Sequence, residues 1–220
     1  MPGVISFGME QILRYLRRLE RYRNRKRLMN RSFSLISNNC IGGIISHDMH
    51  LRFLSPTVNL SFANDGFLLF CRHLDYYLSI PVEEVVSDKG YPVGVLKGDY
   101  GDIFLYFMHY GSFPEAKQKW EERASRVDME NLFIVMEAQK CDESVLRRFD
   151  ELEFPNKVIL TDGYHPGIGC SFPVKDGFYD EDYFNGKILS YPKFGLRRYL
   201  DSFDYVSFFN KGVIRKRRLL

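Results

Sequence analysis

The part of the sequence that most constrains the fold is residues 32–62, SFSLISNNCIGGIISHDMHLRFLSPTVNLSF. A β-type run, residues 33–37, is followed by Asn38, Asn39, Cys40, Ile41, Gly42 and Gly43, and apolar residues then recur at roughly helical spacing over 44–53. Many α/β proteins build their sites at such a junction, because the N–H groups of the helix start point outward beyond the strand end. The stretch therefore predicts an α/β fold with a candidate site at this glycine-containing turn.

The rest of the chain alternates β-type runs with amphipathic segments. We expect strands at residues 58–62, 82–86, 91–96, 102–109, 132–137 and 157–161, and helices at residues 66–78, 114–127 and 142–152. The run 102–109 is almost wholly apolar, which predicts a central strand buried on both faces. The alternation indicates an α/β layered domain with a largely parallel or mixed central sheet flanked by helices.

Both ends of the chain are basic, whereas the middle is acidic. Residues 1–31 hold nine Arg and Lys against two Glu, a net charge of +7, and residues 211–220 carry +5 with no acid. Because the whole chain carries +3, residues 32–210 carry −9. We therefore divide the chain into a basic amphipathic N-terminal arm (1–31), an α/β domain (32–210) and a basic C-terminal tail (211–220).

Residues 10–28 predict a basic amphipathic helix, because apolar side chains recur there at spacings of three and four. Three interpretations stand. The helix binds an anionic membrane surface, packs on its own domain or a second subunit, or binds RNA. The membrane interpretation places Arg14, Arg17, Arg18, Arg21 and Arg25 at lipid head groups, and the C-terminal tail would contact the same surface. The acidic middle argues against nucleic acid, since it would repel a phosphate backbone.

The cysteine pattern leaves two interpretations of Cys40. The four cysteines are widely spaced and form no CxxC pair, which argues against a zinc ribbon or a thioredoxin-type site. A thiol beside a helix N-terminus has a lowered pKa and can act as a nucleophile, whereas a lone cysteine after a strand is most often a small buried hydrophobe. The sequence shows no secretory signal and no membrane-spanning run, so we expect reduced thiols and a cytoplasmic location.

Two later segments could join Cys40 in a site. His109 and Tyr110 lie at the end of the run 102–109, and His109 there is either a general base for Cys40, a donor to phosphate or a packed core histidine. Asp162 follows the run 157–161 and either orients a histidine, binds a sugar hydroxyl or forms an ordinary Asp-Gly turn. We predict that Cys40, His109 and the turn 38–43 line one cavity.

The sequence gives little support for a metal site. His47, Asp48 and His50 have a spacing that could hold a metal, but no other cluster completes the ligand set, so we predict no metal. Residues 180–182, Asp-Glu-Asp, match the Asp-x-Asp pattern of metal-dependent sugar transferases, but three letters are weak evidence and a solvated acidic loop explains them better.

Taken together, the strings SLISNNCIGG, SPTVNLSF, LDYYL, YPVG, FMHYGSFPEAKQKWEERASRV, NLFIVM and KVILTD resemble the bacterial domain-of-unknown-function family 1919. The resemblance covers about residues 32–210 and leaves the N-terminal arm outside. Matching positions include Asn38, Asn39, Cys40, Gly42, Gly43, His109, Tyr110 and Arg123. Ile41 departs from the family pattern, which often has a bulky aromatic residue there, and we expect this difference to change a stacking contact.

Members of that family are often labelled exopolysaccharide or capsule biosynthesis proteins. The resemblance therefore implies assembly or decoration of a bacterial surface polysaccharide, at the cytoplasmic face of the membrane. It implies no particular cofactor.

From this setting we expect a glycosyl- or acyltransferase that acts on a glycan or a lipid-linked sugar precursor. In the acyl version Cys40 is the nucleophile and His109 its base. In the glycosyl version Gly42, Gly43 and the helix N-terminus hold a diphosphate, and His109 or Asp162 assists. Substrate contacts come from Asn38, Asn39 and Tyr110. The alternative is a non-catalytic glycan-binding or scaffold protein of a polysaccharide assembly complex.

Overall fold

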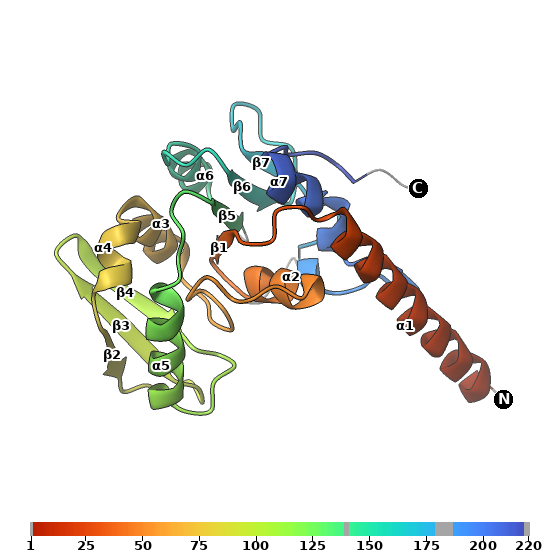
Figure 1. Cartoon of the computed structure of the whole chain (residues 1–220), viewed down its shortest axis with the longest axis horizontal. Coiled ribbons are helices and arrows are strands. Elements are labelled where there is room, and N and C mark those ends of the chain that lie inside the picture. Colours follow the sequence, from red (N-terminus) through yellow and green to blue (C-terminus); the bar gives the residue numbers. More distant parts are fainter. Residues whose placement is uncertain (1, 139–140, 179–186, 218–220) are drawn as a thin grey trace.

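A computed structural model describes residues 2–138, 141–178 and 187–217 of the 220-residue chain. Two sheets form its body (Figure 1), a parallel sheet with strand order β1-β5-β6-β7 and an antiparallel sheet with strand order β2-β3-β4. Helices pack on both faces of the parallel sheet. The chain is thus a layered, mixed α/β protein, which confirms the expected fold class.

The parallel sheet contains β1 (Ser34–Ser37), β5 (Leu132–Glu137), β6 (Lys157–Thr161) and β7 (Ser171–Pro173). Every residue of β1 and β5 is buried, because helices cover both faces of this parallel sheet. Alternate residues of β5 enter different cores, with Ile134 on one face and Val135 on the other. Since the strands run in one direction, their carboxyl ends gather at one edge of the sheet.

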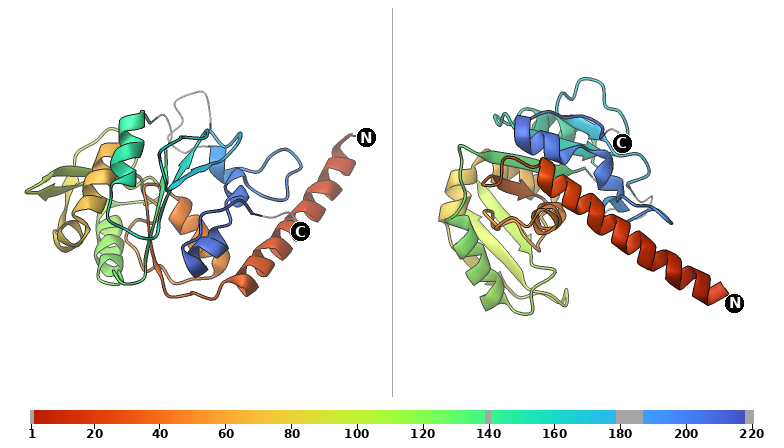
Figure 2. Two further views of the ribbon diagram at one scale, coloured as in Figure 1. Left: turned by 90° about the horizontal axis from the view of Figure 1, so that it is seen from above. Right: turned by 45° about the vertical axis from the view of Figure 1, so that its right-hand side comes forward.

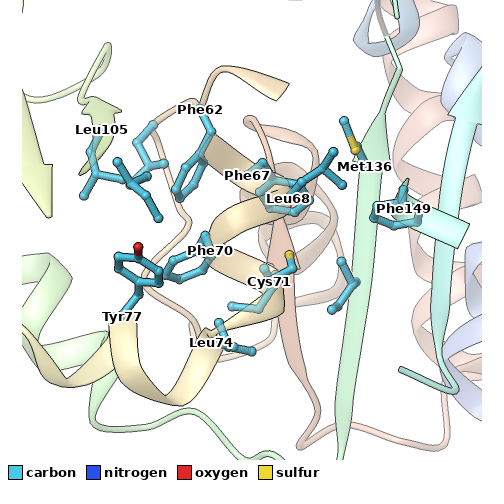
Figure 3. Close-up of a cluster of buried hydrophobic side chains, with 14 of the residues drawn as sticks. Phe62, Phe67, Leu68, Phe70, Cys71, Leu74, Tyr77, Leu105, Met136 and Phe149 are labelled. Carbon is cyan, nitrogen blue, oxygen red and sulfur yellow. The ribbon is translucent and has the colours of Figure 1, made fainter. Parts of the chain in front are cut away.

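Helices cover the two faces of this sheet. One face holds α2 (Ile41–Met49) and α7 (Tyr205–Lys211), and the other holds α3 (Asn64–Arg72) and α6 (Glu143–Asp150). Figure 3 shows the second core, where Phe67 and Leu68 of α3 approach Met136 of β5 and Phe149 of α6. The short 3-10 helices η1 (Lys187–Leu189) and η2 (Tyr199–Ser202) precede α7.

The antiparallel sheet lies beside α3. Its strands are β2 (Val82–Val85), β3 (Val93–Gly98) and β4 (Gly101–Tyr106), and α4 (Leu74–Ser79) and α5 (Phe113–Ala124) flank it in Figure 1. The expectation of a central, doubly buried strand at 102–109 is wrong. β4 lies at the end of the strand order and only alternate residues are buried, so that Phe104 is 45% exposed while Ile103 packs against the core.

Three expected elements differ in extent. Helix α2 begins at Ile41, so Gly42 and Gly43 belong to its first turn. The helix expected at 66–78 is divided into α3 and α4 at His73, whose φ of −125° is not helical. Residues 58–62 form only an isolated bridge, between Ser61 and Tyr106. The helix expected at 114–127 is confirmed as α5, and it begins after Ser112, whose side chain accepts the backbone N–H of Glu115.

The basic N-terminal helix is α1 (Pro2–Arg27), whose C-terminal half packs on the body while the N-terminal half projects from it (Figure 2). Arg27 pairs with Asp204 at 2.9 Å, and Asn24 donates to the hydroxyl of Tyr205 at 2.9 Å. Arg217 near the C-terminus pairs with Glu20 of α1 at 2.7 Å. The basic arm is thus joined to the α/β domain, and the basic C-terminal tail is joined to the arm. None of the helices described is long and apolar enough to cross a bilayer.

Candidate functional site

The carboxyl edge of the parallel sheet brings together residues that follow β1, β5 and β6. In the β1–β5 ladder Ser37 pairs with Val135, so two residues further on Asn39 comes level with Glu137. On the other side of β5, Glu137 pairs with Leu160, and Asp162 follows shortly after. Such edges are the usual position of ligand sites in open α/β sheets. This edge is therefore the candidate site.

Asn38 continues the β1–β5 pairing with its side chain. Its amide donates to the backbone oxygen of Glu137 at 3.0 Å and accepts the Glu137 N–H at 2.9 Å. The backbone oxygen of Asn38 is then available for Phe62, which donates its N–H at 2.9 Å. Asn38 thus fixes the backbone on which Glu137 is carried, and this is a positioning role.

Glu137 is the acid at the centre of the edge, and only 2% of its surface is exposed. The side-chain amide of Asn39 donates to its carboxylate, while the Asn39 side-chain oxygen accepts the N–H of Ile41 at 3.0 Å. One asparagine therefore holds both the carboxylate and the first turn of α2. Buried carboxylates are rare unless they are partnered, and they are frequent at functional sites.

The turn expected to hold a phosphate is instead packed into the body. A Cβ added at Gly42 would lie 2.6 Å from the hydroxyl oxygen of Ser37, and one at Gly43 would lie 3.2 Å from Val58. The Gly42 N–H donates to the Ser37 hydroxyl at 3.1 Å. Because Ile41 and Gly42 already donate internally, the start of α2 has lost two of the N–H groups that a phosphate would need.

Ser55 and Thr57 brace the same turn from the loop after α2. The Thr57 hydroxyl accepts the backbone N–H of Ser37 at 3.0 Å, and the Ser55 and Thr57 hydroxyls lie 3.0 Å apart. All three side chains are buried. These hydroxyls fix the end of β1 and, through it, the position of Asn39.

Cys40 precedes α2, as expected, but its electrostatics are the opposite of those of a reactive thiol. The thiol is buried, and burial raises its pKa, with the negative charge of Glu137 adding to the effect. The helix dipole favours a thiolate, but desolvation and the nearby carboxylate outweigh it. The expectation of a lowered pKa at Cys40 is wrong.

The turn after β4 contributes Tyr110 rather than His109 to this region. His109 is exposed, and no hydrogen bond or ion pair of its side chain occurs among the described residues. Tyr110 is half-buried and close enough to Cys40 for the thiol charge to raise its pKa, although burial is the main cause. Its hydroxyl donates to the Val58 oxygen at 3.0 Å and accepts from Arg123 of α5 at 2.7 Å. Tyr110 thus joins the Val58 backbone, in the loop after α2, to the guanidinium of Arg123.

The rim beside β6 is acidic. The Asp162 carboxylate is 73% exposed and lies 3.5 Å from His165, so it orients a histidine as one interpretation expected. The negative charge of this region acts on the thiol of Cys141, whose pKa is raised to about 12. Burial is the largest cause, and the carboxylates of Asp142, Asp65, Glu137 and Asp162 add to it. No cluster of three potential metal ligands occurs in the described residues, and residues 180–182 lie outside them.

Glu137 and Arg123 were not predicted as functional residues. The available signal for Glu137 was a single acid at the end of the run LFIVME, where an apolar parallel strand ends at the edge that binds ligands. No sequence pattern pointed to Arg123, because its position depends on a hydrogen bond to the hydroxyl of Tyr110.

Fold and edge together define a layered α/β protein with a polar, carboxylate-containing candidate site where parallel strands end. Residues 12–210 match the family described as "Domain of unknown function (DUF1919)", and the chain belongs to this family. The match begins within α1, so the family domain includes part of the arm that the resemblance had left outside. A protein of Haemophilus influenzae (strain ATCC 51907 / DSM 11121 / KW20 / Rd), described as "Uncharacterized protein", is 39% identical over 186 residues, which cover 84% of this chain and 87% of the relative.

Proposed function

We propose that this protein is a transferase that acts on a glycan or a lipid-linked sugar precursor in bacterial surface polysaccharide biosynthesis. The observation that carries the proposal is Glu137, a carboxylate at the end of the central strand β5, held by Asn39 and buried beside the exposed Asp162. Carboxylates and amides are groups that bind sugar hydroxyls, and a partly desolvated carboxylate can accept a proton from one.

Glycosyl transfer is the version that the site supports better. In it, a hydroxyl of the acceptor sugar gives its proton to Glu137 while its oxygen bonds to the anomeric carbon of the donor. The bond from that carbon to the donor phosphate breaks, and the phosphate leaves with the electron pair. Arg123, held by Tyr110, supplies positive charge toward that leaving group, and Asp162 and His165 bind hydroxyls at the rim.

Acyl transfer through Cys40 has less support, because the raised pKa leaves little thiolate at neutral pH. Acyl transfer in which Glu137 activates the acceptor hydroxyl directly remains within the proposal. His109 takes no catalytic role in either version, since it lies exposed after an edge strand.

A non-catalytic glycan-binding or scaffold protein is the second candidate. The deep burial of Glu137 and the internal pairing at the start of α2 favour it, because both can serve stability alone. The two candidates differ in turnover, which a scaffold does not have.

The test is performed on a bacterial strain from which the gene has been deleted. Mass spectrometry of its surface polysaccharide should show a missing sugar or substituent, and an unchanged polysaccharide would contradict the proposal. Purified protein, in catalytic amount, is then incubated with lipid-linked precursors from that strain and with pooled nucleotide sugars or acyl donors. Conversion of many precursor molecules per protein supports a transferase, and the added mass separates glycosyl from acyl transfer. Conversion of the precursor that requires as many protein molecules as precursor molecules favours the scaffold.

A further inference from the structure

The helix α1 has one face that is fully occupied by its own domain. Arg17 donates to the backbone oxygen of Gly195 at 2.8 Å and stacks over Tyr191, with 3.8 Å between guanidinium and ring centre. Glu20 pairs with Arg197 and Arg217 at 3.3 and 2.7 Å. Of the arginines predicted to face lipid, Arg17 therefore holds the helix to the body. Arg21 does so too, through Tyr191 and Asp48.

The opposite face of α1 is apolar and open. Ile12, Tyr15 and Tyr22 are 57%, 67% and 47% exposed, and the half-buried Leu19 completes a stripe at spacings of three and four residues. We name these four residues the outer stripe. Among the residues that the structure describes, no element other than α1 covers it, although aromatic and aliphatic side chains of this size normally find a partner.

Charge flanks the outer stripe on both sides and has one sign. Arg14 and Arg18 are exposed on one side and Arg23 on the other, and the exposed Lys26 follows Tyr22 one helical turn later. Lys26 lies over the Tyr22 ring at 4.8 Å, and Arg23 has only a long ion pair, 3.8 Å, with Glu20. A second copy of the chain docked on this stripe would bring like charges together, so the charge favours an anionic partner.

A basic pocket adjoins the stripe between α1 and α2. Its volume is about 300 Å³, and it is lined by Arg18, Arg21, Arg25, His47, Asp48 and His50. The carboxylate of Asp48 is already neutralised by Arg198 at 2.7 Å and Arg21 at 3.7 Å. Arg25 donates to the Asp48 backbone oxygen at 3.0 Å and lies 3.1 Å from a ring nitrogen of His50. The pocket therefore offers excess positive charge to a phosphate-sized group.

We infer that α1 docks the protein on an anionic lipid bilayer. The outer stripe inserts its side chains at the level of the head groups, Arg14, Arg18, Arg23 and Lys26 contact anionic lipids around it, and the pocket holds one lipid phosphate. Amphipathic helices with aromatic side chains on one face and basic residues beside it bind membrane surfaces in this way. The inference does not depend on the proposed function, since it concerns a different surface.

The experiment measures co-sedimentation of the full chain with phosphatidylcholine vesicles, with and without phosphatidylglycerol. Deleting α1 would also expose Asp204 and Tyr205, so point variants are used instead. Arg14→Gln with Arg18→Gln should weaken binding about 30-fold at low salt, because each basic residue near an anionic surface adds roughly a factor of five. Ile12→Ser with Tyr15→Ser should weaken it at all salt concentrations. The matched control, Lys117→Gln with Arg147→Gln, removes the same charge from a half-exposed position on α5 and an exposed position on α6 and should bind like the wild type.

Several outcomes would overturn the inference. One is equal binding to neutral and anionic vesicles, and another is an equal loss of vesicle binding in the control variant. A third is a protein that binds no vesicles but forms a dimer in analytical ultracentrifugation, if the Ile12→Ser, Tyr15→Ser variant abolishes that dimer. Binding of glycerol phosphate without any binding of vesicles would also overturn it, since the pocket would then serve a soluble ligand. Loss of vesicle binding with unchanged transferase turnover on soluble acceptors separates this inference from the proposed function.

Discussion

Asn39, two residues beyond β1, donates its side-chain amide to the buried carboxylate of Glu137 at the end of β5. The same side chain accepts the N–H of Ile41. The carboxylate at the centre of the candidate site and the helix that follows β1 are thus held by one residue. The proposed chemistry depends on Glu137 in this position. It also assumes that the Cys40 thiol is not the nucleophile.

The thiol of Cys40 should react slowly. Its pKa is raised by burial and by Glu137, so at neutral pH it is almost entirely protonated. We expect iodoacetamide at pH 7 to alkylate Cys40 more slowly in the folded protein than in the protein unfolded in urea, and the rate in the folded protein to increase as the pH rises toward 9. Peptide mass spectrometry measures both rates. Cys40→Ser should keep the activity of the protein, and faster labelling of Cys40 in the folded than in the unfolded protein would restore it as a candidate nucleophile.

The contact between Ser37 and Gly42 should show a coupled stability effect. In Gly42→Ala the new Cβ would lie 2.6 Å from the Ser37 hydroxyl, which would have to leave its bonds to Asn39 and Gly42. We expect a loss of about 1–3 kcal/mol in the free energy of unfolding, measured in urea. With Ser37→Ala already present, Gly42→Ala should cost less, because the clashing oxygen is gone.

The control for this contact is Gly8→Ala in α1, where a new Cβ meets nothing within 4 Å. It should be neutral or stabilising by at most about 1 kcal/mol, since alanine favours the helix. Costs that simply add in the Ser37→Ala, Gly42→Ala pair would contradict the proposed contact.

Asp204 should carry a pH-dependent part of the stability. Its pKa is lowered by the side chains of Ser207, Arg27 and Arg215 in spite of burial. The charged form is therefore favoured in the folded state, so its contribution is present above the unfolded pKa of about 4 and is lost as the pH falls through the folded pKa.

We expect Asp204→Asn to lower the free energy of unfolding at pH 7 by about 3 kcal/mol, because it leaves two arginines without their carboxylate. The difference from the wild type should narrow as the pH falls below about 4. Asp65→Asn removes an exposed pair with Arg148 and should cost less than about 1 kcal/mol. Equal effects of the two substitutions would contradict the role of Asp204 in fastening α1 to α7.

The sequence was sufficient for the elements whose patterns are local. The strands β5 and β6, the helix α5 and the strand before Asn38 were all predicted, because each depends on neighbouring residues. The position of β4 was not predicted, since an apolar run such as DIFLYF fits a central strand as well as an edge strand that packs on α3. Only strand pairing distinguishes the two.

The candidate site was predicted only in part, because strand pairing brings some of its residues together and local patterns do not specify that pairing. The residues after β1 follow directly from the strand–turn–helix pattern. Glu137 joins them because β1 and β5 pair in register across about 100 residues of chain, and no local pattern specifies that pairing. The raised pKa of Cys40 also depends on Glu137, so the sign of that shift could not be read from residues 32–62.

The central claim is that Glu137 acts on a substrate and does not merely stabilise the fold. Glu137→Gln keeps the shape of the side chain and can still accept the hydrogen bond from Asn39, but it removes the charge. The most direct measurement compares its thermal unfolding midpoint with its ability to restore the surface polysaccharide in the deletion strain, beside the control Glu151→Gln on the exposed end of α6. We predict a midpoint within about 5 °C of that of the wild type, because the glutamine keeps the shape of the side chain and the hydrogen bond from Asn39, together with a loss of product formation of at least about 100-fold. Full restoration of the polysaccharide, or a loss explained by a midpoint that falls by more than about 5 °C, would contradict the account.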